Sequence, residues 1–214
     1  INVNPQNLKK DKTYQEINGK DDLSNGDKLD SQIAYNDKNI DIDKSDTISN
    51  NQGYKYPKFY KGIYLNISRA MSLRYIKYFV KMAKRSSINT FVLDVQSHRY
   101  KKCIVPKKIV DYLLKNGIHP IARVVIFPGG LRYYPVSERL IRHKLDIAES
   151  ACKVGFKEIQ FDYIRFADSH RLRHISRAKR YAFVEGLLAR AKRHLKKYNI
   201  KLAADIFGRI PLNK

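Results

Sequence analysis

The spacing of apolar residues changes repeatedly after about residue 57, and each change marks a predicted element. Short, nearly continuous apolar runs are typical of buried strands, and they occur at residues 62–67, 90–95, 119–127, 158–166 and 201–207. Between them, apolar residues recur every three or four positions, which predicts helices at residues 72–85, 106–117, 138–154 and 176–198. Pro106 is suited to a first helical turn, and Gly117 and Gly155 to helix ends.

Strands that alternate with helices predict a parallel sheet with right-handed crossovers, which places the chain in the α/β class. Two architectures fit this order: an open, doubly wound sheet and a closed (β/α)8 barrel of the TIM type. The residues after the first predicted strand are Asn66-Ile67-Ser68-Arg69-Ala70, and they contain no glycine-rich phosphate loop. A dinucleotide-binding fold therefore loses its best support.

The first quarter of the chain has a different composition. Residues 1–56 are rich in Asn, Asp, Lys and Ser and show no sustained period, so we expect a disordered polar tail or tether. The predicted barrel-type domain covers residues 57–214. Since the chain begins with Ile1, the sequence is expected to be a processed form or a fragment.

Charge is divided in the same way. Residues 1–52 carry seven lysines and ten acidic residues, whereas residues 53–214 have a net charge of +26. Such an excess favours an anionic polymer, a nucleic acid or a membrane surface as partner, although Lys-rich composition is also common in AT-rich genomes. No run reaches the roughly 18 apolar residues of a membrane span. Cys103 and Cys152 form neither a disulfide framework nor a metal-binding pattern.

Polar residues follow the apolar part of every predicted strand. They are Asn66 on the first, Asp94 and Gln96 on the second, Arg123 on the third, Gln160 and Asp162 on the fourth, and Asp205 on the fifth. In barrel enzymes the carboxyl ends of the strands form the active site, so we expect these side chains to meet at one rim. The structural alternative is a set of ion pairs that holds the strands together, such as Arg123 with Asp94 or Asp162.

Paired carboxylates suit glycoside hydrolysis, in which one protonates the leaving oxygen and the other attacks the sugar or activates water. They also suit a divalent metal with oxygen ligands, and the residues alone leave both chemistries open. No histidine stands at a strand end with zinc-ligand spacing, and no Gly-x-Ser-x-Gly elbow is present.

Several motifs in this order resemble the putative glycosyl hydrolase domain family of bacteria. They are Lys61–Leu65, Phe91–Val95, Gly117–Phe127, Gly155–Phe166 and Ala203–Gly208, of which Glu158-Ile159-Gln160-Phe161-Asp162-Tyr163-Ile164-Arg165-Phe166 is the most specific. The resemblance, over about residues 61–210, implies a TIM barrel distantly related to the α-amylase type. We expect no cofactor. It implies Asp162 as nucleophile and Asp205 as acid/base. We expect the substrate to contact Asn66, Asp94, Gln96, Arg123, Gln160 and Arg165.

The chain departs from this family in three respects. The loop after the second strand is basic (Gln96–Tyr100), Ala167 stands where the family has proline, and the sequence ends after the fifth of eight expected strands. We therefore expect an incomplete barrel that is inactive alone or is completed by an oligomer or a complementing chain.

The predicted function is hydrolysis of a carbohydrate such as a cell-envelope polysaccharide, in a secreted or envelope-associated protein, with a cytoplasmic location as the alternative. The alternative function is a non-catalytic binding or structural module. Its support is the basic stretch at residues 165–198, which could bind an anionic polymer or nucleic acid.

Overall fold

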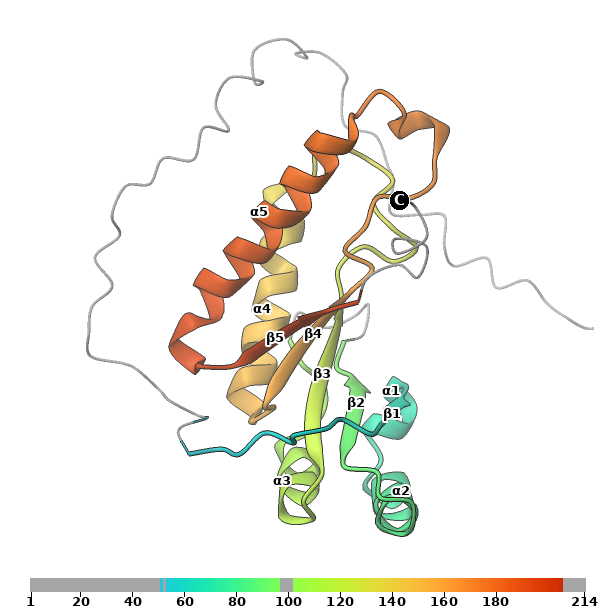
Figure 1. Ribbon diagram of the computed structural model, residues 1–214, viewed down its shortest axis with the longest axis vertical. Coiled ribbons are helices and arrows are strands. Elements are labelled where there is room, and N and C mark those ends of the chain that lie inside the picture. The colour runs from blue at the N-terminus through green and yellow to red at the C-terminus, as the bar shows by residue number, and fades with distance from the viewer. Residues whose placement is uncertain (1–50, 52, 97–101, 206–214) are drawn as a thin grey trace, which may run out of the picture. The chain divides into compact units, whose positions relative to one another are not determined.

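Five parallel strands form a single sheet in the computed structural model, which describes residues 51, 53–96 and 102–205 (Figure 1). The strands are β1 (Gly62–Leu65), β2 (Thr90–Asp94), β3 (His119–Val125), β4 (Glu158–Asp162) and β5 (Lys201–Ala204). Their order in the sheet is the order in the chain, and all neighbouring pairs are parallel. This winding is that of a TIM barrel and not of a doubly wound sheet, in which the order reverses at a switch point. The predicted fold class is confirmed.

Helices connect successive strands as the apolar periods predict. They are α1 (Ile67–Ala70), α2 (Leu73–Arg85), α3 (Lys107–Lys115), α4 (Glu138–Val154) and α5 (Arg177–Leu195), with short 3-10 turns η1 (His170–Leu172) and η2 (Lys196–Tyr198). Ser137 and Ser176 accept hydrogen bonds from the backbone at the starts of α4 and α5, and Gly155 ends α4 at φ 111°. Among the described residues, no helix combines the length and the apolar character that crossing a bilayer requires.

The two faces of the sheet have different surroundings. On β2, Phe91 and Leu93 are fully buried in a core that also contains Ile76 of α2 and Ile109 of α3. Asp94 lies on the opposite face, because alternate residues of a strand point to opposite sides, and it is partly exposed. The helix-covered face is therefore apolar, and the other face carries the polar side chains that the sequence analysis singled out.

The starts of the strands are covered by residues just before β1. Tyr54 hydrogen-bonds His119 (2.9 Å), and Tyr60 donates to Glu158 (2.9 Å), while His119 and Glu158 contact each other at 3.2 Å. His119 and Glu158 are buried, so this polar network fills the base of the sheet. Contacts to the domain thus begin within the predicted tail of residues 1–56, of which residues 1–50 and 52 lie outside the described part of the chain.

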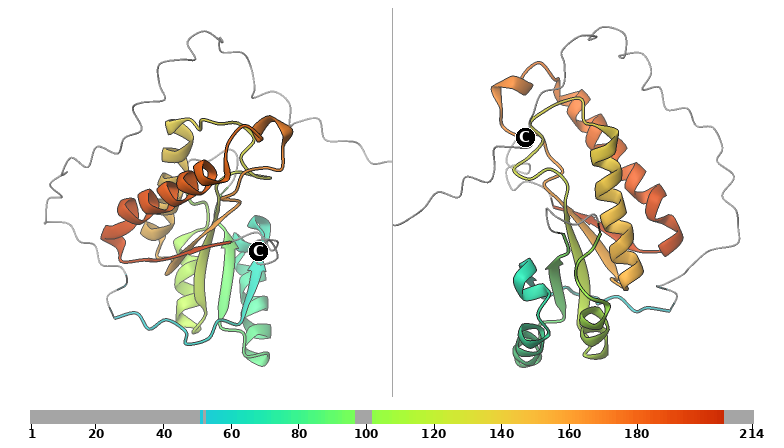
Figure 2. Two further views of the ribbon diagram at one scale, coloured as in Figure 1. Left: turned by 45° about the horizontal axis from the view of Figure 1, so that its top comes forward. Right: turned by 180° about the vertical axis from the view of Figure 1, so that it is seen from behind.

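Helices α4 and α5 run side by side (Figures 1 and 2), and Glu149 lies at their seam. Its carboxylate accepts hydrogen bonds from Tyr198 (2.8 Å) and contacts Lys197 (3.0 Å), Lys153 (3.2 Å) and His194 (3.2 Å). Burial alone would raise the pKa of Glu149, but the hydrogen bonds from Tyr198, Lys197 and Lys153 outweigh it and lower that pKa to about 2.

This lowered pKa predicts an acid-sensitive contribution to stability. The contribution is complete above about pH 4.5, where Glu149 of the unfolded chain is ionised, and is lost as the pH falls toward 2. The Glu149→Gln variant should therefore lose about 1–2 kcal/mol at pH 7 and show a flatter decline of its free energy of unfolding between pH 4.5 and pH 2.5. Urea titrations at several pH values measure this, with Glu185→Gln at an exposed position of α5 as the matched control. Parallel pH curves for all three proteins would contradict the assignment.

Candidate functional site

Arg123 joins two of the predicted site carboxylates. Its guanidinium donates to Asp94 (Nη1 to Oδ1, 2.6 Å) and to Asp162 (Nε to Oδ2, 2.8 Å), with a further contact from Nη2 to Asp162. The three side chains come from adjacent strands and are each about one-fifth exposed. Register explains the meeting, because Asp94 of β2 pairs with Arg123 of β3, and β3 pairs in turn with β4.

Tyr64 of β1 completes this cluster and was missed in the sequence analysis. Its hydroxyl donates to Asp94 Oδ2 at 2.5 Å, and its ring lies 5.2 Å from the guanidinium carbon of Arg123. Burial and the hydrogen bond to Asp94 raise the pKa of Tyr64 to about 12, so the phenol remains a donor at neutral pH. The available signal was position: Tyr64 lies two residues before Asn66 and so shares its face of the strand predicted at residues 62–67.

The backbone fixes Asp162 at the end of β4. The strand was predicted to continue to residue 166, but Tyr163 adopts φ 52° and stops it. In that conformation the Tyr163 N–H donates to Asp162 Oδ1 at 2.6 Å. Both oxygens of Asp162 are therefore engaged, Oδ2 by Arg123 and Oδ1 by the backbone, which sets the orientation of the carboxylate.

Asp205 is hydrogen-bonded to Gln160, which lies opposite Arg123 on β4. The Gln160 side-chain amide donates to Asp205 Oδ1, and the Asp205 N–H donates to the carbonyl of Phe161 at 2.9 Å. Within the described ranges, Asp205 has no ion pair with a basic side chain. The carboxylate is thus held by a neutral donor, unlike that of Asp162.

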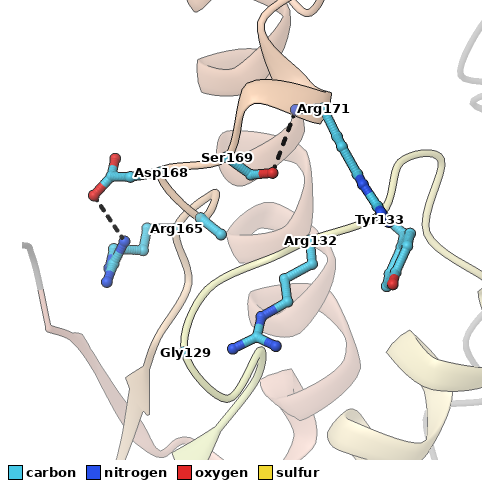
Figure 3. Close-up of a pocket in the computed structure, with 8 residues that line it drawn as sticks. Gly129, Arg132, Tyr133, Arg165, Asp168, Ser169 and Arg171 are labelled. Carbon is cyan, nitrogen blue, oxygen red and sulfur yellow. Dashed lines mark hydrogen bonds and ion pairs between the residues drawn. The ribbon is translucent and has the colours of Figure 1, made fainter.

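Three other predicted residues have different surroundings. Asn66 caps α1 by accepting from the Arg69 N–H (3.3 Å), and Gln96 forms two hydrogen bonds of 3.1 Å with the backbone of Val125. Arg165 lines a separate pocket in the loops after β3 and β4 (Figure 3). The structure therefore brings Asp94, Arg123, Gln160, Asp162 and Asp205 together with Tyr64 in a strand-end cluster, whereas the side chains of Asn66 and Gln96 bind backbone groups.

Electrostatics in the cluster favour the charged form of Arg123. Burial would lower the pKa of this guanidinium, but its hydrogen bonds to Asp94 and Asp162 outweigh burial and raise it. The arrangement can therefore hold an ionised carboxylate in a fixed orientation.

Another group of side chains has the spacing of a metal site. Among the described residues, Asp146, Glu149 and His194 place potential ligand atoms within 4.8 Å of one another. Glu149 already contacts Lys153 and Lys197, so its charge is balanced by ammonium groups. This group lies at the α4–α5 seam and contains none of the predicted site residues.

Comparison with known proteins supports the assignment made from sequence motifs. Residues 131–214 match the model of the family described as a putative glycosyl hydrolase domain, which confirms the resemblance over that part of the chain. The match includes Gln160, Asp162 and Asp205 and links this segment to carbohydrate-related proteins. No curated protein matches the chain in sequence.

A solved structure shares the fold. The crystal structure of a hypothetical protein from Ruminiclostridium thermocellum ATCC 27405 is 23% identical, with a TM-score of 0.54, over 69% of this chain and 99% of that chain. An L-ribulose 3-epimerase (9% identical, TM-score 0.48) is matched over 69% of this chain and 50% of its own. An O-GlcNAc hydrolase of Thermobaculum terrenum is 10% identical with a TM-score of 0.46, and the match covers 68% of this chain and 34% of that chain. The chain thus spans half of the epimerase and about a third of the hydrolase.

Proposed function

We propose that this domain cleaves glycosidic bonds at the strand-end cluster, with Asp162 as nucleophile or base and Asp205 as acid. The observation that carries the proposal is the unequal environment of the two carboxylates. Asp162 is paired with Arg123 and fixed by a backbone N–H, which suits a group that acts in its ionised form. Asp205 receives only the neutral amide of Gln160 among the described side chains, so no cation binds it in the way that Arg123 binds Asp162.

The remaining residues of the cluster have positioning roles in this proposal. Arg123 orients Asp162, while Tyr64 and Asp94 hold the other side of the guanidinium. Gln160 orients Asp205 through one end of its amide, and its Oε1 is buried with no protein partner among the described residues. A carbohydrate bound over the rim would meet a surface of carboxylates, an amide and a phenol, which are ordinary hydrogen-bond partners of sugar hydroxyls.

The test is hydrolysis of a panel of aryl glycosides and polysaccharides by the parent chain and by Asp162→Asn. On any substrate that the parent cleaves, Asp162→Asn should reduce kcat/KM by about a thousandfold or more. The substitution removes the carboxylate that attacks the sugar or activates the water molecule. The matched control is Asp111→Asn, which removes an exposed carboxylate from α3 and should leave turnover unchanged.

A specific observation also favours the second candidate, a non-catalytic module. Asp94, Arg123 and Asp162 form the ion pairs that a purely structural cluster would form. In that case Asp162→Asn would lower stability without changing any turnover. If a folded Asp162→Asn protein hydrolyses the substrate as fast as the parent does, the enzymatic assignment of this residue is refuted.

A further inference from the structure

A polar pocket of about 480 Å³ lies in the loops beyond the carboxyl ends of β3 and β4 (Figure 3). It is formed by the loop after β3 and the loop after β4, so both of its walls continue strands that carry Arg123 and Asp162. Its lining includes Arg132 and Tyr133 from the first loop and Arg165, Asp168 and Arg171 from the second.

Backbone bonds hold the two walls together. The Leu131 N–H donates to the carbonyl of Arg165, and the Ala167 N–H donates to the carbonyl of Leu131, both at 2.8 Å. Gly130 permits this approach, because a Cβ on it would lie 2.9 Å from the backbone of Ala167 and its φ is 91°. The pocket is therefore built on a fixed junction between the loops.

The lining carries more positive than negative charge. Three guanidinium groups, those of Arg132, Arg165 and Arg171, share the pocket with one carboxylate, that of Asp168. Asp168 is 86% exposed and lies 3.9 Å from Arg165, which makes the pair a weak one in water. Arg132 and Arg171 form no ion pair within the described part of the chain.

Three guanidinium groups that line one pocket are suited to binding anionic oxygens. Each offers a planar fork of N–H donors that matches a carboxylate or phosphate group in two-point hydrogen bonding. The exposed ring of Tyr133, which follows Arg132 in the loop after β3, offers an apolar face to a sugar ring. The net charge of +26 on residues 53–214 would also increase the encounter rate with a polyanion.

We propose that this pocket binds an anionic substituent, a carboxylate or a phosphate, of a glycan that extends from the strand-end cluster. This inference rests on the proposed function and narrows its substrate to acidic polysaccharides. The arginine pocket supplies charge recognition in the loops after β3 and β4, and Asp162 and Asp205 supply the chemistry at the ends of β4 and β5.

Binding of defined probes to the full chain tests the pocket separately from catalysis. Isothermal titration at low salt would use a galacturonate hexamer, its fully methyl-esterified form and inorganic phosphate. The hexamer should bind to the parent, the neutral ester should bind at least tenfold more weakly, and the Arg132→Gln/Arg171→Gln variant should lose at least tenfold in affinity for the hexamer. Binding of phosphate alone, lost in the same variant, would support a phosphate-bearing glycan in place of a uronate.

A matched control removes two arginines elsewhere. The Arg74→Gln/Arg85→Gln variant loses the same charge from exposed positions of α2 and should change the affinity less than twofold. Equal weakening in both double variants, tight binding of the neutral ester, stronger binding of a single-stranded oligonucleotide, or no binding of either anion would overturn the proposal.

The same variants separate this proposal from the proposed function. If Asp162→Asn retains turnover but the arginine variant loses hexamer binding, the catalytic assignment fails and the pocket remains. If Asp162→Asn abolishes turnover but the arginine variant binds normally, the pocket assignment fails and the catalytic one remains.

Discussion

Replacing Arg123 with methionine is expected to lower the free energy of unfolding by about 3 kcal/mol. The guanidinium is the shared partner of Asp94 and Asp162, and its side chain is 17% exposed. Its removal leaves two neighbouring, mostly buried carboxylates that repel each other, and breaking such a pair is more costly than never having formed it. Urea unfolding at pH 7, followed by circular dichroism, measures the loss.

Two further variants show whether charge is the cause. Arg142→Met removes an exposed guanidinium that lies 3.9 Å from Glu138, and it should cost less than about 0.5 kcal/mol. Adding Asp94→Asn to Arg123→Met removes one of the two repelling charges and should restore part of the loss. If Arg123→Met costs as little as Arg142→Met, the cluster does not hold the three strands together.

The strand-end cluster was predictable because it depends on strand positions. In a parallel sheet the carboxyl ends of neighbouring strands meet, so polar residues at the ends of β2, β3 and β4 had to lie close together whatever the loops do. Their pairing also follows from register, since Asp94 lies opposite Arg123. The structural alternative weighed from the sequence, an Arg123 pair with Asp94 or Asp162, is present, and both pairs form at once.

Features that depend on loop conformation were not predictable. Periodicity gave no sign that Tyr163 would adopt φ 52° and end β4 four residues early, because the apolar run continues to Phe166. The arginine pocket likewise depends on the bridge between Leu131 and Phe166, which joins residues far apart in the sequence. Arg171 was assigned to a general basic stretch, and only the folded loops place it beside Arg132.

The network at the base of the sheet also could not be predicted from local sequence pattern. His119 and Glu158 start two predicted strands and were treated as ordinary strand residues, although a buried ionisable group needs a partner. Their partners, Tyr54 and Tyr60, come from the segment before β1, where the sequence shows no period. Local pattern could not have joined them, since the contacts span 65 and 98 residues of chain.

Removing Glu158 from this network is expected to destabilise the domain by about 3 kcal/mol. In Glu158→Ala, the His119 ring and the Tyr60 hydroxyl lose their shared acceptor at a site where the Glu158 and His119 side chains are 6% and 1% exposed. A buried polar group without its partner costs about 1–3 kcal/mol, and here the buried His119 ring loses its partner together with the partly exposed Tyr60 hydroxyl. Glu158→Gln keeps one acceptor oxygen and should lose about half as much, while Glu185→Ala on the exposed face of α5 should be nearly neutral.

The pH dependence of this effect identifies its origin. Burial would raise the pKa of Glu158, but the hydrogen bonds from His119 and Tyr60 outweigh it and hold that pKa below its usual value. The stabilisation is therefore complete above about pH 4.5 and declines as the pH falls through the lowered pKa. The difference in free energy of unfolding between the parent and Glu158→Ala should shrink from pH 7 to pH 3. A constant difference over this range would show that lost packing, and not the ionised carboxylate, accounts for the destabilisation.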